Sequence, residues 1–129
     1  MIRKLLAWGP AVIWAAVLFY LSSQTWSGGP ALVEINDKVG HFLLYATLGA
    51  ALGYGRVRSP GPVPHWLLLT VGFLYAVSDE IHQSFVPGRT ASLTDLAADA
   101  VGLLAGYGGY LALTRTGSKP GAEPTDINP

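Results

Sequence analysis

Four long apolar segments constrain the fold of this chain more than any other feature of its sequence. They cover Leu5–Leu21, Val39–Tyr54, Trp66–Ser78 with a polar extension to Ser84, and Leu96–Thr114. A helix that crosses a bilayer needs about 20 apolar residues, with a range of about 17–25. The first and fourth segments reach this length outright, and the other two reach it when their polar ends are counted as helix. We therefore predict an all-α membrane protein, a bundle of four transmembrane helices.

The composition agrees with this fold class and excludes several functions. Charged residues are 12% of the chain, about half of the ~25% that is usual in soluble domains. The net charge is zero, so the basic footprint of a nucleic-acid-binding protein is missing. With no cysteine in the sequence, neither a disulfide nor a cysteine-based zinc site or nucleophile can form. The apolar run after Arg3 and Lys4 is interpreted as an uncleaved signal anchor, because no small-residue cleavage site follows it.

The basic residues predict the orientation of the bundle. Six of the eight fall on one side of a four-span arrangement: Arg3, Lys4, Arg56, Arg58, Arg115 and Lys119. Because basic loop residues favour the cytoplasmic side of a membrane, both termini are expected in the cytoplasm. Residues 1–116 are predicted to form the membrane domain. Residues 117–129 are rich in Pro, Gly and polar residues and are predicted to be a disordered cytoplasmic tail.

Two of the predicted helices carry a polar stripe that continues as a glycine stripe. At i, i+4 spacing the second helix shows Asp37, His41, Tyr45, Gly49 and Gly53. On one face of the fourth helix, at i, i+3 and i, i+4 spacing, lie Asp95, Asp99, Gly102 and Gly106. Asn36 is expected to cap the second helix, and Ser92 or Thr94 the fourth. Small residues at this spacing let helix backbones approach closely in a membrane. We therefore expect these two helices to pack together, with their polar ends meeting at the outer side.

The third helix and the turn after it complete a candidate site. Val86-Pro87-Gly88-Arg89 has the composition of a tight turn with positive φ at glycine, and we expect it to bring Arg89 back to pair with Asp79, Glu80 or Asp95. Tyr45 is expected to pack with its hydroxyl satisfied. The candidate ligand-binding or polar-network residues are Asp37, Lys38, His41, Tyr45, Asp79, Glu80, Gln83, Arg89, Asp95 and Asp99. No catalytic residue is assigned, and no metal-binding motif is matched.

The charge balance at this outer end is unusual. Six acidic residues, the candidates Asp37, Asp79, Glu80, Asp95 and Asp99 together with Glu34, face only two basic residues, Lys38 and Arg89. Buried like charges cannot all remain ionised without compensation. Some of the acids must be protonated, exposed to solvent or neutralised by a cation. Two helix N-termini at the same end would in turn favour an anionic group.

The chain resembles the VanZ family of small bacterial membrane proteins. The resemblance is carried by Phe19-Tyr-Leu-Ser-Ser-Gln24, by Asp37-Lys-Val-Gly-His-Phe-Leu-Leu-Tyr45, and by the run from Asp79 through Pro87-Gly88-Arg89 to Asp95, with Asp99 and Gly102. The chain departs from the family at Asp99, where the family more often has Asn. The resemblance implies an integral protein of the bacterial cell membrane, and a link to low-level resistance to the glycopeptide teicoplanin, without supplying a catalytic residue.

Three functions follow as hypotheses. The first is an envelope protein whose outward-facing polar pocket binds a lipid-linked envelope precursor or a glycopeptide-type ligand. The second is a membrane hydrolase or transferase acting on polyprenyl-phosphate or peptidoglycan precursors, with a divalent cation absorbing the excess negative charge. The third is a transporter enlarged by homo-oligomerisation through exposed glycines. The alternative to all three is that the polar residues form a purely structural network that holds the helix ends together.

Overall fold

The computed structural model describes residues 1–25 and 31–117, and for residues 31–36 it describes the backbone alone. The predictions made for Glu34 and for the tail beyond Gly117 lie outside these described side chains and residues. Within this part of the chain the secondary structure is entirely helical. The helices are α1 (Ile2–Ser22), α2 (Ala31–Arg58), α3 (His65–Ser84) and α4 (Leu93–Thr116). The predicted all-α fold with four helices is confirmed.

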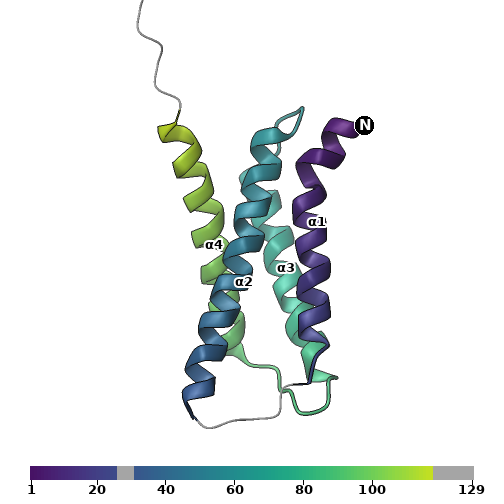
Figure 1. Ribbon diagram of the computed structural model, residues 1–129, viewed down its shortest axis with the longest axis vertical. Coiled ribbons are helices and arrows are strands. Elements are labelled where there is room, and N and C mark those ends of the chain that lie inside the picture. Colours follow the sequence, from purple (N-terminus) through teal and green to yellow (C-terminus); the bar gives the residue numbers. More distant parts are fainter. Residues whose placement is uncertain (26–30, 118–129) are drawn as a thin grey trace, which may run out of the picture.

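The helices alternate in direction along the bundle (Figure 1). The start of α1 and the end of α4 lie at one end, together with the connection between α2 and α3. The end of α1, the start of α2 and the connection from α3 to α4 lie at the other end. As a result α2 and α4 run in the same direction, and both begin at the end where the predicted polar residues are.

The start of α2 differs from the prediction, whereas the start of α4 agrees with it. Helix α2 begins at Ala31, so Asn36 lies inside the helix and is not its N-cap. The residues before Ala31 are Gly-Gly-Pro, and proline is well suited to a helix start but not to a helix interior. Helix α4 is capped by Ser92, whose Oγ accepts a hydrogen bond from the Asp95 backbone N–H at 3.4 Å.

Glycines bring the backbones of α2 and α4 into direct contact, as predicted. A Cβ atom at Gly49 would overlap the carbonyl oxygen of Leu103. A Cβ at Gly102 would overlap the carbonyl of Phe42, and one at Gly106 would overlap the carbonyl of Ala46. Only a residue without a side chain allows this approach. The glycine contact therefore fixes the spacing of α2 and α4, and we call it the α2–α4 seam.

The outer surface of the bundle is strongly apolar. Among the described residues, α1 and α4 are the helices long and apolar enough to cross a membrane, and only 22% of each span is buried. The shorter apolar stretches of α2 and α3 do not reach that threshold by themselves, because both helices carry polar ends. Large side chains nevertheless face outwards on all four helices, for example Leu6, Val39, Leu74 and Leu104. Such a surface needs an apolar environment.

Candidate functional site

The polar side chains gather at the end of the bundle where α2 and α4 begin and α3 ends. A cavity of about 440 Å³ opens there. Part of its wall is apolar and includes Leu18, Leu21 and Leu43. The polar part of its wall includes Asp37, His41, Tyr45, Asp79, Gln83 and Arg89. The cavity is thus lined by α1, α2, α3 and the loop after α3.

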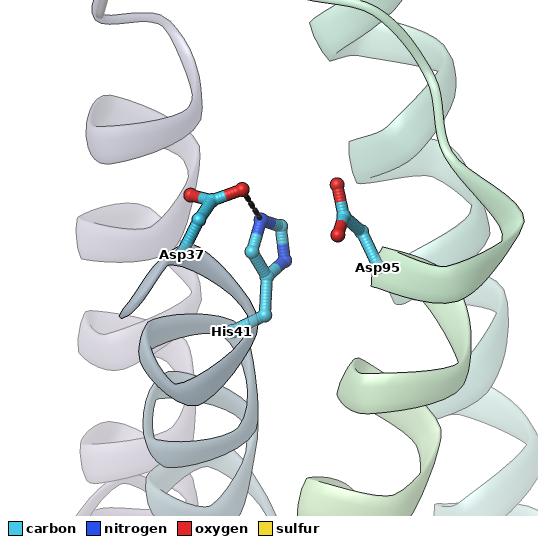
Figure 2. A group of neighbouring side chains, drawn as sticks. All are labelled: Asp37, His41 and Asp95. Carbon is cyan, nitrogen blue, oxygen red and sulfur yellow. Dashed lines mark ion pairs between the residues drawn. The ribbon is translucent and has the colours of Figure 1, made fainter. Parts of the chain in front are cut away.

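His41 is the centre of the polar cluster. Its side chain is buried, and its Nδ1 lies 2.7 Å from Oδ1 of Asp99, a carboxylate with no exposed surface. The other ring nitrogen, Nε2, lies 3.9 Å from Oδ2 of Asp37, which is half-exposed. Figure 2 shows Asp37 and His41 on α2 facing Asp95 on α4. The imidazole therefore presents one nitrogen to a buried acid and the other to the outer carboxylates.

The pair Lys38 and Asp95 joins the same two helices nearer the surface. Lys38 Nζ donates to Oδ1 of Asp95 at 3.2 Å. Asp95 is buried at the first turn of α4, while Lys38 remains partly exposed. Since carboxylates in the first turn of a helix are favoured by its dipole, the position of Asp95 is stabilised by both the helix and the lysine.

Asp79 is held by partners from α2 and α3. The Tyr45 hydroxyl donates to Asp79 Oδ2 at 2.9 Å, and Gln83 Nε2 donates to the same oxygen at 3.5 Å. All three side chains are buried. The prediction that Tyr45 packs with a satisfied hydroxyl is therefore confirmed.

Glu80 links α3 to the start of α4. Its Oε2 accepts a hydrogen bond from the backbone N–H of Ser92 at 3.0 Å. Ser92 is also the N-cap of α4, so the same residue caps that helix with its side chain and donates its backbone N–H to Glu80. Glu80 is 5% exposed, and this hydrogen bond directs its carboxylate towards α4.

The predicted pairing of Arg89 with an acid is wrong. The turn itself is as expected, with Gly88 at φ +81° and the Arg89 N–H donating to the Val86 carbonyl at 3.1 Å. The guanidinium, however, donates from Nη1 to the carbonyls of Leu21 and Gln24, both at 3.4 Å. These carbonyls lie at the C-terminal end of α1, where unsatisfied oxygens carry partial negative charge. Arg89 therefore tethers the loop to α1 while it also lines the cavity.

Three buried carboxylate oxygens have no hydrogen-bond partner among the described residues: Asp79 Oδ1, Glu80 Oε1 and Asp99 Oδ2. A buried acceptor without a partner costs about 1–3 kcal/mol, and more when it is charged. The excess of acids seen in the sequence is therefore concentrated in the interior, on α3 and α4.

Two groups of side chains are arranged so that they could hold a metal ion. One consists of Asp37, His41 and Asp95 (Figure 2), and the other of His41, Glu80 and Asp99. Within each group the potential ligand atoms all lie within 4.8 Å of one another. No metal motif is visible in the sequence because these ligands come from different helices, and their spacing along the chain carries no local pattern.

Sequence reasoning missed the contribution of α1 to the cavity. Leu18, Leu21 and Ser22 line it, but they look like ordinary residues of an apolar span. A signal existed in the stretch Phe19–Gln24, which belongs to the family resemblance although it has no charged residue. Sequence reasoning also left His82 out of the candidates, yet its Nε2 lies 3.0 Å from Ser23 Oγ and its ring stacks on Phe19 with 4.7 Å between the ring centroids.

The cluster combines parts that are suited to binding and to proton transfer. An imidazole oriented by a buried carboxylate can act as an acid or base, and a guanidinium at a cavity wall can bind a phosphate or carboxylate. The apolar wall formed by α1 and α2 can hold a hydrocarbon chain.

The family profile described as VanZ/LLP1 matches residues 7–114. Comparison with curated proteins and with solved structures finds no match.

Proposed function

The chain belongs to the VanZ/LLP1 family, and on that premise we propose that it is an integral protein of the bacterial cell membrane that binds an amphiphilic envelope ligand. The ligand we favour is a lipid-linked precursor with an anionic headgroup. The observation that carries this proposal is the cavity, whose wall is apolar at Leu18, Leu21 and Leu43 and polar at His41 and Arg89.

The membrane location is supported by the outward-facing apolar side chains on all four helices. Helices α2 and α3 cross the bilayer beside α1 and α4, and their polar ends lie at the membrane surface. The end of the bundle away from the cavity carries Arg3, Lys4, Arg56, Arg58 and Arg115. By the positive-inside tendency this end is cytoplasmic, so the cavity opens towards the outside of the cell.

The size and lining of the cavity support an amphiphilic ligand. A volume of about 440 Å³ falls within the range of about 300–1,000 Å³ that is usual for small-molecule sites. It accommodates a headgroup and the first carbons of a chain, and the rest of a long chain stays in the bilayer. The leucines on α1 and α2 contact the chain.

Arg89 binds the headgroup. Its two hydrogen bonds to carbonyl oxygens are long, at 3.4 Å, and both use Nη1. A guanidinium has five N–H donors, and a phosphate or carboxylate can accept two of them in parallel. His41 and Tyr45 line the same cavity. The Tyr45 proton is donated to Asp79, so the Tyr45 oxygen can accept from a ligand hydroxyl, and His41 Nε2 offers a further polar contact.

The experiment is a binding measurement on the full chain in nanodiscs, with undecaprenyl phosphate as the probe and the uncharged prenol as its matched control. Arg89→Gln should weaken binding of the phosphate by at least about tenfold, since a charge-assisted hydrogen bond contributes about 1.5–3 kcal/mol. Arg58→Gln, at the other end of the bundle, should leave it unchanged. Equal affinity of the phosphate and the prenol, or of the two variants, would refute the proposal.

A glycopeptide ligand is tested separately. Teicoplanin replaces the polyprenyl phosphate in the same binding measurement, and susceptibility to the drug is compared in cells with and without the chain. Binding of teicoplanin alone would show that the cavity takes the drug and not the precursor. Protection that survives Arg89→Gln would show that the cavity is not responsible for resistance.

A membrane hydrolase or transferase is the second candidate, and one observation favours it. The buried pair His41 and Asp99, 2.7 Å apart, resembles an acid–base residue with the carboxylate that orients it. Release of phosphate from polyprenyl diphosphate by the purified chain, lost in His41→Gln, would establish turnover. Binding without turnover leaves the first proposal standing.

A further inference from the structure

The second group of potential ligands, His41, Glu80 and Asp99, lies inside the bundle. His41 belongs to α2, Glu80 to α3 and Asp99 to α4, and their ligand atoms lie within 4.8 Å of one another. The three residues are 7%, 5% and 0% exposed. Acidic residues on a protein surface often cluster without binding a ligand. This group differs because its three residues are buried and come from three helices.

Two carboxylate oxygens in this group lack a partner among the described residues. Glu80 uses Oε2 to accept from the Ser92 N–H, which leaves Oε1 without a hydrogen bond. Asp99 uses Oδ1 for His41, which leaves Oδ2 without one. Both free oxygens are buried, and native proteins rarely leave such atoms unsatisfied. A proton or a metal ion, each of which accepts an electron pair, would satisfy such oxygens.

The two basic side chains at this end of the bundle are engaged elsewhere. Lys38 donates to Asp95 at 3.2 Å, and Arg89 donates to the carbonyls of Leu21 and Gln24. Two buried carboxylates at close range cannot both stay charged without a cation or a shared proton.

We propose that His41, Glu80 and Asp99 bind a divalent metal ion of the Zn²⁺ or Mn²⁺ type. One imidazole nitrogen and two carboxylate oxygens suit these ions, whereas Mg²⁺ and Ca²⁺ prefer oxygen alone. The cation takes the place of a ring proton of His41 and binds one oxygen from each of Glu80 and Asp99. Three protein ligands leave at least one coordination position open.

The outer group, Asp37, His41 and Asp95, is the weaker candidate for the same ion. Asp37 is half-exposed, and Asp95 already accepts from Lys38. Neither acid has a buried oxygen without a partner among the described residues. The inner group therefore has the greater need of a cation.

This proposal does not depend on the proposed ligand. Glu80 and Asp99 are not among the residues that line the cavity, and Arg89 and Leu43 line it without belonging to the metal group. Loss of metal in variants of the first two residues and loss of ligand in variants of the others are therefore separate results.

The experiment measures the metal content of the full chain, purified in detergent with an affinity tag that contains no histidine. The chain is incubated with Zn²⁺, Mn²⁺ or Mg²⁺, and excess ion is removed. Elemental mass spectrometry should then find about one Zn²⁺ or Mn²⁺ per chain, and no comparable amount of Mg²⁺. Glu80→Gln and Asp99→Asn should weaken binding by at least about tenfold, as even outer-sphere partners of a metal contribute that much. Asp79→Asn is the matched control, since Asp79 is a buried acid next to Glu80 that also has a free oxygen but lies outside the group.

A measurement on the unmodified chain covers the case in which the variants do not fold. Co²⁺ bound at this site should give d–d absorption bands, and Zn²⁺ should raise the midpoint of thermal unfolding in a way that a chelator reverses. Absence of bound metal and of any change in midpoint would overturn the proposal and leave a proton shared by Glu80 and Asp99. Loss of metal in Asp37→Asn but not in Glu80→Gln would overturn it in favour of the outer group.

Discussion

The hydroxyl of Tyr45 donates a hydrogen bond of 2.9 Å to Oδ2 of Asp79, and this bond joins α2 to α3 inside the bundle. Both residues are buried, at 1% and 6% exposed. Asp79 Oδ1 has no partner among the described residues, so the tyrosine is the main donor that compensates the burial of this acid.

Tyr45→Phe should therefore destabilise the fold. It removes one oxygen atom and leaves a buried carboxylate with only the 3.5 Å contact to Gln83, so we expect a loss of about 1–3 kcal/mol in the free energy of unfolding. Denaturant titration in detergent, followed by tryptophan fluorescence, measures this loss. Tyr20→Phe is the control, because Tyr20 is 64% exposed. Equal stability of the two variants would contradict the importance given to the Asp79 bond.

The α2–α4 seam predicts a contrast between two glycines of the same helix. Gly106→Ala places a methyl group against the Ala46 carbonyl, whereas Gly108→Ala meets no atom within 4 Å. Overpacking of this kind costs about 1–3 kcal/mol, so Gly106→Ala should unfold at lower denaturant concentration. Gly108→Ala should match the unmodified chain or exceed it slightly, since alanine is the better helix former. The same titration compares them, and a greater loss in Gly108→Ala would be incompatible with the seam.

The proposed orientation can be tested by cysteine labelling, because the sequence contains no cysteine. Thr90→Cys lies in the exposed loop between α3 and α4, and Gly61→Cys lies in the exposed loop between α2 and α3. A maleimide that cannot cross membranes should label Thr90→Cys on intact cells and Gly61→Cys only after the cells are opened. The reverse pattern would place the cavity at the cytoplasmic side.

Ser92 supports both the start of α4 and, through its N–H, Glu80. Ser92→Ala removes the Oγ acceptor of the Asp95 N–H but keeps the backbone donor to Glu80. A loss of about 0.5–2 kcal/mol is expected from the missing cap, measured by the same denaturant titration. Ser84→Ala provides the control, because Ser84 is exposed at the end of α3 and its hydroxyl donates to the Ile81 carbonyl of the same helix. If both serines can be replaced without loss, the cap does not contribute to stability.

Local patterns in the sequence are sufficient to predict the four helices and the packing of α2 against α4. Apolar length located all four helices, and the i, i+4 glycines identified the faces that meet. The start of α2 was missed because Asn36, a good capping residue, follows an apolar stretch that begins at Ala31. A cap signal inside a helix has no weight when the residues before it also form helix.

The partners of the charged residues could not be predicted in the same way. The sequence offered Arg89 a choice of acids, yet it binds the carbonyl oxygens at the end of α1. Backbone carbonyls have no signature in a sequence, and their availability depends on where α1 ends in space. The grouping of His41, Glu80 and Asp99 likewise depends on how three helices are placed around one point.

The seam between α2 and α4 also decides which polar residues can meet. Sliding α4 by one turn, about 5.4 Å, would place Ala98 or Tyr110 where Gly102 or Gly106 now sits, since these residues are four positions apart. Their side chains would collide with the carbonyls of Phe42 or Ala46, so a single axial register is allowed. In that register alone does the His41 imidazole reach Asp99. The choice of carboxylate for the histidine is therefore made by glycines that lie further along the two helices.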